Sequence, residues 1–286
     1  MAIEARRLPV TISRLSAPLV KSFAELGTWL IFSGRVLKGG VVDVVVGRRF
    51  GKVVVRSISD IVAGPGFIAA GAGMVFVLAA TQASVGAEIG IQAFKNLQVI
   101  GAQAFTGLVA SFINVREIAP LIYAVALAAQ VGAGFTAEIG AMRISDEIDA
   151  LEVMGVPSVT YLVCTRVIAM VLTFLPLYII GLFVSFLLAQ VTVTKVFGMS
   201  PGLYSYYFHL FLPPIDVVFS IIKVFIFTVL ITLIHCYYGY YASGGPVGVG
   251  LAVGKAIRVT IVVVVMVNLL LTFLFWGHGA TVSITG

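Results

Sequence analysis

The sequence has few charged residues for its length. Asp, Glu, Lys and Arg make up 10% of its 286 residues and hydrophobic residues make up 60%, whereas a soluble domain has about 25% charged residues. A water-soluble fold would have to expose more polar surface than this composition supplies, whereas a surface that faces lipid needs none. Because backbone groups inside a bilayer must be hydrogen bonded within the protein, the composition predicts an all-α, polytopic membrane protein.

Cysteine and catalytic motifs are also scarce. Cys164 and Cys236 lie in or beside apolar runs without a CxxC motif, so we expect them to pack rather than to form a disulfide or bind a metal. The histidines, His209, His235 and His278, are far apart, and neither GxSxG nor HExxH occurs. The sequence therefore predicts neither an enzyme nor a metal site.

A nucleotide-binding motif is missing as well. The nearest candidate, GLAVGKA at 250–256, has three rather than four residues between its glycines. Ala256 also occupies the position where Ser or Thr would bind magnesium. If the protein moves a solute with energy from ATP, we expect another protein to bind the nucleotide.

Long uncharged runs are present instead, and they predict about five membrane spans. A helix needs roughly 20 apolar residues to cross a ~30 Å hydrocarbon core. The runs that reach this length are 61–87, 118–137, 167–194, 224–254 and 259–286. Residues 96–115 are uncharged too, but they are rich in Asn, Gln, Ser and Thr. We interpret them as a re-entrant or outer-surface helix rather than as a sixth span.

The basic residues predict the orientation of these spans. Ten of the eighteen Lys and Arg residues lie in the first 56 residues, where no signal peptide is recognisable. With five spans and a cytoplasmic N-terminus, the remaining loop cations divide into Lys95, Arg116 and Lys195 outside and Arg143, Arg166, Lys255 and Arg258 inside. This is the bias of the positive-inside rule, and it places the C-terminus outside.

The region before the first span predicts an amphipathic helix at the membrane interface. Its apolar residues recur at steps of three and four: Leu15, Leu19, Phe23, Leu26 and Leu30. A soluble helix that packs into a core is the alternative. We therefore divide the chain into a cytoplasmic or interfacial region, residues 1–58, and a transmembrane domain, residues 59–286.

A short segment between the second and third predicted spans is strongly acidic. Its acidic residues are Asp146, Glu147, Asp149 and Glu152. As a helix it also has an apolar stripe, formed by Ile144, Ile148, Leu151 and Met154, and its acids have no Lys or Arg at an i+4 position. We expect a short helix that docks its stripe into a groove on another cytoplasmic protein, with the acids against basic residues at the rim. A solvated loop helix is the alternative.

Three motifs in the chain resemble one family of membrane proteins. They are REIAP at 116–120, TAEIGAMR at 136–143 and EIDALEVMG at 147–155. Together, at this spacing, they resemble the MlaE/YrbE permeases of the Mla and Mce lipid transporters, over roughly residues 60–280. HCYYGY at 235–240 and GGPVGVG at 244–250 resemble more particularly the YrbE B-type subunit of actinobacterial Mce systems.

The resemblance implies a set of partners. In that family two permeases form the membrane core of an ABC-type transporter, two cytoplasmic ATPases bind ATP and magnesium, and MCE-domain proteins carry lipid outside. The B-type motifs imply that the second permease is a related YrbE-type subunit, giving a heterodimer in the inner (plasma) membrane. The chain itself is implied to hold no cofactor.

The resemblance also implies roles for individual residues. The coupling helix received by the ATPase is implied to consist of Ser145, Asp146, Glu147, Ile148, Asp149, Ala150, Leu151, Glu152 and Met154. The lipid path, in the first span and at the outer mouth of a cavity between two permeases, is implied to include Phe76, Ala80, Gln82, Arg116 and Glu117.

The motifs and the absences together predict the permease subunit of an ATP-driven Mce-type transporter. It is expected to import a lipid such as a fatty acid, a sterol or a related molecule. One alternative is a proton-coupled secondary carrier, which would need an essential carboxylate among Glu88, Glu138 and Asp216. The other is a membrane scaffold that transports nothing.

Overall fold

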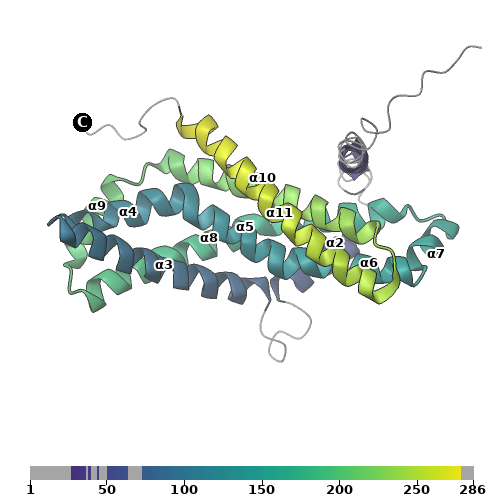
Figure 1. Cartoon of the computed structure of the whole chain (residues 1–286), viewed down its shortest axis with the longest axis horizontal. Helices are drawn as coiled ribbons and strands as arrows, with labels where there is room; N and C mark the ends of the chain where they lie inside the picture. Colours follow the sequence, from purple (N-terminus) through teal and green to yellow (C-terminus); the bar gives the residue numbers. More distant parts are fainter. Residues whose placement is uncertain (1–26, 37, 40–43, 45–49, 64–72, 278–286) are drawn as a thin grey trace, which may run out of the picture.

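The protein is a bundle of long helices (Figure 1). The computed structural model describes residues 27–36, 38–39, 44, 50–63 and 73–277, and these include no β-strand. Residues 27–36 are helical, and the α-helices after them are α2 (Gly51–Val62), α3 (Met74–Val99), α4 (Thr106–Ile113), α5 (Ala119–Leu127), α6 (Ala133–Ile144), α7 (Glu147–Val153), α8 (Thr165–Val191), α9 (Pro201–Leu210), α10 (Pro214–Tyr240) and α11 (Gly245–Trp276). The prediction of an all-α fold is confirmed.

Short irregular turns join several of these helices end to end. They are the 3-10 turn η2 (Gln103–Phe105) and the π-helical turns η3 (Asn114–Ile118), η4 (Ala128–Gly132), η5 (Thr160–Cys164) and η6 (Thr192–Val196). A π-helical turn holds an extra residue, so it widens the helix locally and changes the direction in which side chains point.

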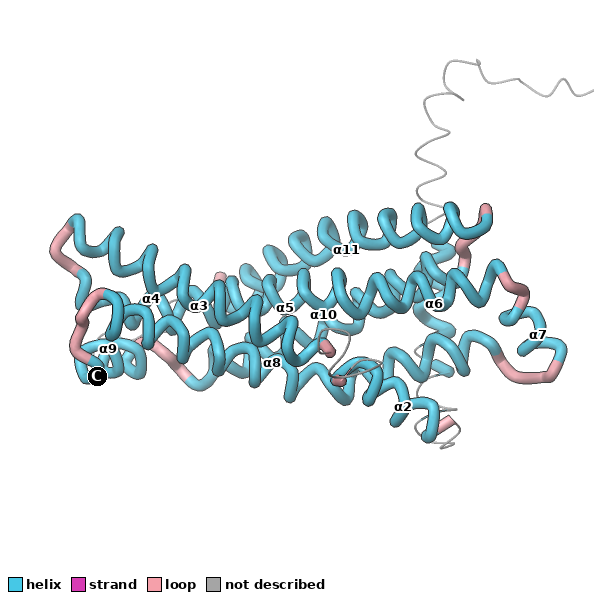
Figure 2. Tube along the Cα trace, turned by 90° about the horizontal axis from the view of Figure 1, so that it is seen from below, coloured by secondary structure: helices cyan, strands magenta, loops and turns pink. Residues whose placement is uncertain are grey.

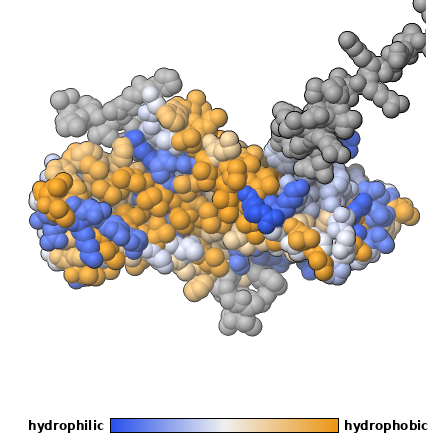
Figure 3. Space-filling model, in the orientation of Figure 1, coloured by the Kyte–Doolittle hydropathy of each residue, from blue (hydrophilic) through white to orange (hydrophobic). Residues whose placement is uncertain are grey.

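Five helical segments of the described chain are long and apolar enough to cross a membrane, as predicted. They are Met74–Val99, Gln103–Ile144, Thr160–Val196, Pro214–Tyr240 and Gly245–Trp276. In Figure 3 hydrophobic residues dominate the middle of the visible face, and hydrophilic residues gather mostly towards its ends. The first span was expected at 61–87 and lies later. The count of uncharged residues stopped at Glu88, whereas the helix keeps Glu88 and Lys95 exposed and continues.

The second span corrects the interpretation of residues 96–115. Residues 96–115 are neither a sixth span nor a separate re-entrant piece, because residues 96–99 end α3 and the helix from Gln103 runs on to Ile144. Several of its polar residues donate hydrogen bonds inside the bundle. The buried Asn114 amide, for example, donates a 2.9 Å hydrogen bond to Ser185 Oγ on α8.

The boundary between the last two spans also differs from the prediction. The break falls at residues 241–244 rather than between 254 and 259. Gly244 has a φ of +92°, which favours glycine, and Pro246 stands in the first turn of α11, where proline is well tolerated. Lys255 and Arg258 therefore lie within α11 instead of in a loop before it.

Close backbone contacts hold α3 against α8, and α10 lies against α6, α8 and α11 (Figure 2). A β-carbon at Gly86 of α3 would collide with the backbone carbonyl of Ser185 on α8. Small residues at such positions allow helices to approach within van der Waals distance where lipid supplies no hydrophobic driving force. The interior also contains Tyr123, Tyr178 and Phe227, all fully buried.

The two ends of the bundle carry different elements. The segment α7 and the turn at 241–244 lie at one end, whereas α9 and the turn between α3 and α4 lie at the other (Figure 1). This grouping agrees with the topology predicted from the basic residues, although the assignment of one end to the cytoplasm stays a prediction.

Only part of the predicted N-terminal amphipathic helix belongs to the described residues. Leu15, Leu19, Phe23 and Leu26 lie outside them, and Leu30 is exposed. In the helical residues 27–36, Phe32 is buried and packs edge-on against Tyr237, with ring centroids 5.5 Å apart. The division of the chain at residue 58 stays a prediction.

Both cysteines are buried, which agrees with the prediction that they pack in the interior. Cys164 Sγ donates to the carbonyl of Val36 at 3.3 Å. This contact ties the helical residues 27–36 to the start of α8.

Candidate functional site

Arg116 and Glu117 lie in the π-helical turn η3, about a third of the way along the second span. The widened turn brings both side chains into reach of α10 and α11. They meet Asp216 and Lys223 of α10, and these four residues are called the buried charge cluster below. It contains two cations and two anions and is therefore neutral overall.

The first ion pair of the cluster joins Arg116 to Asp216. Two guanidinium nitrogens, Nε and one Nη, donate to Asp216 Oδ2 at 2.8 and 2.7 Å. The Asp216 side chain is 1% exposed and that of Arg116 is 12% exposed. Trp276 Nε1 donates to the other carboxylate oxygen at 2.9 Å, and Phe112 lies 3.6 Å below the guanidinium. Both charges are thus largely removed from solvent and paired.

The second ion pair joins Glu117 to the fully buried Lys223. Lys223 Nζ donates to Glu117 Oε1 at 3.2 Å and to the carbonyl of Arg116 at 2.7 Å. Asn268 and Thr272 of α11 donate to Glu117 at 2.7 and 2.6 Å. Glu117 therefore receives three hydrogen bonds, and the cluster connects the second, fourth and fifth spans. Asn268, Thr272 and Trp276 were missed by the sequence reasoning, although they are polar or interfacial residues within an apolar run.

The acidic segment forms α7, a short helix at the opposite end of the bundle from α9 (Figure 1). Asp146, Glu147, Asp149 and Glu152 are called the α7 acidic cluster below. All four are exposed, as are Ser145 and Ala150. Asp146 precedes the helix with a φ of +59°, a left-handed conformation that Asp tolerates better than most residues.

Two of the acids have local partners. Arg143, six residues before Asp149, donates to its carboxylate at 2.8 Å, and Ser145 Oγ donates to Glu147 at 2.9 Å. The i+4 spacing rule overlooked Arg143 because a turn lies between the two residues, so they are not on one helix.

Glu152 connects α7 to the rest of the bundle. Ser158 Oγ donates to Glu152 at 2.6 Å, and the Tyr240 hydroxyl at the end of α10 donates to the same oxygen at 3.3 Å. Glu152 is thus a contact between α7 and the fourth span.

Ile148 and Leu151 of the apolar stripe pack against the protein's own core, which corrects the prediction that these two residues face a partner. Ile148 is 0% exposed, and Leu151 is partly buried against the same core. Ile148 is therefore not available to a groove on another protein. The apolar residues that do project are Val153 and Met154, with exposures of 89% and 68%. Met154 was predicted as a contact residue and is exposed, whereas Val153 was not predicted.

The predicted path residues of the first span do not share one face. Phe76 and Ala80 are exposed on α3. Gln82 is fully buried, and its Nε2 donates to the carbonyl of Ala119 at 3.0 Å. Gln82 therefore joins two spans of the chain and lines no path on the α3 surface.

The comparison with protein families matches residues 66–274 to the model described as Permease MlaE. The chain belongs to the MlaE permease family. A probable ABC transporter permease protein of Rickettsia bellii is 30% identical over 200 residues, 70% of this chain and 77% of that protein. One of Synechocystis sp. is 33% identical over 202 residues, with the same shares. Protein TRIGALACTOSYLDIACYLGLYCEROL 1, chloroplastic, of Arabidopsis thaliana is 32% identical over 204 residues, 70% of this chain and 57% of that protein.

The matched region of this MlaE permease contains both clusters, the first four candidate spans and all but the last two residues of the fifth. As an ABC-type permease, the chain is a membrane subunit that works with ATPase partners. The finer resemblance to the actinobacterial B-type subunit stays a prediction.

The carboxylates that a proton-coupled carrier would need each have a separate partner in this permease. Glu88 accepts from Gln92 at 2.8 Å, Glu138 pairs with Arg166 at 3.0 Å, and Asp216 belongs to the buried charge cluster. None of these contacts links one of the three carboxylates to another, so no relay is assembled among the described residues. The geometry gives the carrier hypothesis no specific support.

Proposed function

We propose that this chain is the permease subunit of an ATP-driven transporter that moves lipid across the inner membrane, towards the cytoplasm. The trigalactosyldiacylglycerol in the name of the Arabidopsis relative is a galactolipid and supports a lipid as cargo. A fatty acid, a sterol or a related molecule is the proposed substrate class. ATP and magnesium are bound by partner ATPases, and this chain holds no cofactor and catalyses no reaction.

The proposed assembly contains a second, related permease and MCE-domain proteins on the outer side. The N-terminus is cytoplasmic and the C-terminus outside in this arrangement. Phe76 and Ala80, on the exposed face of α3, are proposed to face the lipid path, with Arg116 and Glu117 at its outer mouth. Gln82 is no longer part of the proposal because it is buried inside the chain.

The contact between Glu152 and Tyr240 is the observation that carries the proposed mechanism. Tyr240 ends α10, and the same helix contributes Asp216 and Lys223 to the buried charge cluster. A force applied to α7 by an ATPase therefore reaches α10 directly, and α10 extends to the cluster as one uninterrupted helix. We infer that α7 is the coupling element and that α10 transmits its displacement to the outer half of the bundle.

The proposed docking surface consists of the exposed tip of α7, Val153 and Met154, with Asp146, Glu147 and Asp149 beside it. Carboxylates around an apolar contact suit a groove with basic residues at its rim. Because Ile148 anchors α7 to its own bundle, the tip rather than Ile148 enters the groove.

The change Val153→Asp tests this surface. Val247 in the first turn of α11 provides a matched control, since it is an exposed valine (76%) at the same end of the bundle. We expect Val153→Asp to lower the association constant with the ATPase at least about tenfold, or about 1.4 kcal/mol, because a charge would have to enter an apolar contact. Val247→Asp leaves association unchanged.

The measurement is quantitative co-purification of the ATPase with each variant, together with lipid-dependent ATP hydrolysis in vesicles. Equal association of Val153→Asp and the wild type would rule out the α7 tip as the docking surface. Transport in vesicles that contain no ATPase would instead favour the secondary carrier.

A further inference from the structure

The second span is irregular at η3, where a proline stands inside the helix. The N–H of Ala119 bonds to the carbonyl of Asn114, five residues earlier, so the turn holds one residue more than an α-helical turn. Pro120 follows directly. In a regular α-helix its ring would collide with the carbonyl of Arg116, four residues before it. The wider turn accommodates the ring, so Pro120 accounts for the π-helical form of η3.

The same proline leaves the carbonyl of Val115 without a donor from its own helix. The N–H at i+4 belongs to Ala119 and is bonded to Asn114, and the residue at i+5 is Pro120, which has no N–H. Val115 is fully buried. Because a buried carbonyl without a partner is unfavourable, a side chain has to supply the donor.

Ser220 of α10 supplies it. Its Oγ donates to the carbonyl of Val115 at 2.8 Å, and the residue is fully buried. This bond uses the single hydroxyl hydrogen of Ser220, so the hydroxyl of Tyr178, which contacts Ser220 Oγ, is the donor in that second contact. Tyr178 belongs to α8. The two hydroxyls thus join the third and fourth spans to the backbone of the second.

Neighbouring carbonyls of the second span are bound in the same way. Lys223, three residues after Ser220 on α10, donates to the carbonyl of Arg116 at 2.7 Å. Gln82 of α3 donates to the carbonyl of Ala119 at 3.0 Å. Side chains of other spans therefore hold the backbone on both sides of the Pro120 collision point, and they set the path of the helix there.

We propose that Ser220 is a positioning residue for the buried charge cluster and that Tyr178 supports it. By holding the carbonyl of Val115, Ser220 fixes the backbone directly before Arg116 and Glu117 and keeps both side chains directed at α10 and α11. Closure of η3 to an α-helical turn would rotate them by about 100°, the angle of one residue. The inference rests on the proposed role of these two residues at the outer mouth of the lipid path.

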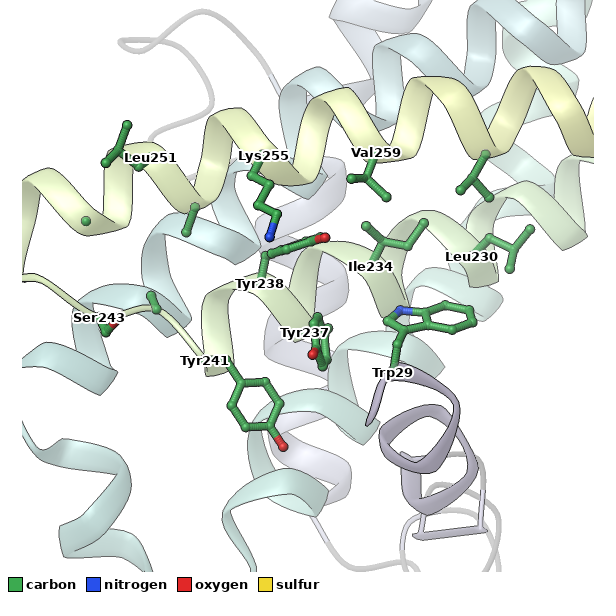
Figure 4. Close-up of a pocket in the computed structure, with 14 residues that line it drawn as sticks. Trp29, Leu230, Ile234, Tyr237, Tyr238, Tyr241, Ser243, Leu251, Lys255 and Val259 are labelled. Carbon is green, nitrogen blue, oxygen red and sulfur yellow. The ribbon is translucent and has the colours of Figure 1, made fainter. Parts of the chain in front are cut away.

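The other end of α10 is separated from α11 by a cavity. Its volume is about 780 Å³, and it lies between the two helices and the helical residues 27–36. Figure 4 shows Lys255 of α11 extending toward Tyr238 of α10 there. Ser220 is about 30 Å from Tyr240 along α10. The cavity gives α10 room to move at the end attached to α7, and Ser220 passes that movement to the second span.

The test uses the full-length protein with its co-purifying partners, reconstituted in lipid vesicles. Ser220→Ala removes the hydroxyl and Ser220→Thr keeps it. Thr232→Val is the matched control, because it removes a buried hydroxyl of α10 that donates within its own helix. We expect Ser220→Ala to lower the maximal rate of lipid transport about tenfold, as for the loss of one buried hydrogen bond. The other two changes leave the rate unaltered, and Tyr178→Phe lowers it by a smaller factor.

Trp276 provides a readout that requires neither transport nor ATP. Its Nε1 donates to Asp216 at 2.9 Å, and its ring centre lies 5.0 Å from the guanidinium carbon of Arg116. The chain has two tryptophans, so Trp29→Phe leaves Trp276 as the one emitter in the purified full-length chain. We expect Ser220→Ala to shift the emission maximum of Trp276, because Arg116 moves, and the two control variants to leave it unchanged.

Pro120→Ala separates positioning from stability. It restores an N–H at position 120, so the helix supplies its own donor, and it removes the collision that favours the π-helical turn. We expect this change to restore the unfolding temperature that Ser220→Ala lowers. The transport rate of the double variant stays low, because an α-helical turn directs Arg116 and Glu117 elsewhere.

Three results would overturn the proposal. They are an unchanged transport rate in Ser220→Ala, an unchanged emission of Trp276, and recovery of transport in the double variant, which would make Ser220 a structural donor alone. If Ser220→Ala does not fold, Tyr178→Phe provides the same comparisons. Wild-type vesicles that move no lipid would contradict the proposed function instead, and the emission of Trp276 would still show whether Ser220 positions the cluster.

Discussion

The buried charge cluster has two cations for two anions, whereas the α7 acidic cluster has four carboxylates and Arg143 as an ion-pair partner. The first joins three spans through residues that are about 100 or more positions apart in the sequence. The second makes mostly local contacts and exposes its remaining charge. Charged side chains therefore hold the bundle together where they are paired and buried. Where they are exposed and mostly unpaired by opposite charges, they form a charged surface instead.

Breaking the buried cluster is expected to have the largest effect on stability. Asp216→Asn removes the anion that pairs with Arg116, and breaking a buried ion pair by removing one partner costs about 3 to 5 kcal/mol. Thermal or chemical unfolding of the protein in detergent measures this loss of stability. Glu88→Gln is the control, because Glu88 is exposed on α3 and bonded to a neutral side chain. A loss below about 1 kcal/mol for Asp216→Asn would mean that the two clusters do not differ as described.

Ile148→Ala sharpens the comparison within α7 itself. Ile148 is fully buried, so its truncation leaves a cavity that destabilises the docked helix by about 2 to 4 kcal/mol. Hydrogen exchange of the amides at 145–158 measures this local effect, which cannot exceed the free energy of detaching α7. Val153→Ala is the matched change on the exposed side of the same helix and leaves exchange unaltered. Equal exchange in both variants would show that α7 is not anchored by its stripe.

The smallest effect is expected for the exposed ion pair. The side chains of Arg143 and Asp149 are 36% and 60% exposed, so Arg143→Gln costs less than about 1 kcal/mol. Added salt should produce a similar change in the wild type and none in the variant, because it screens the same pair. Thermal unfolding at two ionic strengths checks this. A loss of stability as large as that of Asp216→Asn would show that ion pairs in the two clusters contribute equally to stability.

The number of spans followed from the sequence, but their limits did not. Counting uncharged residues assumes that a charge ends a span. Glu88, Lys95, Lys255 and Arg258 all lie within long helices, at positions where their side chains are exposed. Long side chains at such positions reach polar surroundings without ending the helix.

The candidate sites were predicted to a different extent. The motif at 116–120 located Arg116 and Glu117, yet their partners depend on which spans are neighbours, and periodicity carries no such information. Periodicity did identify the stripe of α7. It could not determine whether Ile148 faces the protein's own core or another protein, because both surfaces are apolar. The i+4 rule failed for Arg143 because it applies only within one helix.

The anchoring of α7 also bears on how quickly a partner can bind and leave. With Ile148 buried and Glu152 bonded to Tyr240, the helix is already formed and oriented before any encounter. A partner that recognises the tip therefore meets a preorganised surface, and little conformational entropy is lost on association. Such a contact can be tight enough to be specific and still be made and released within each cycle of ATP hydrolysis.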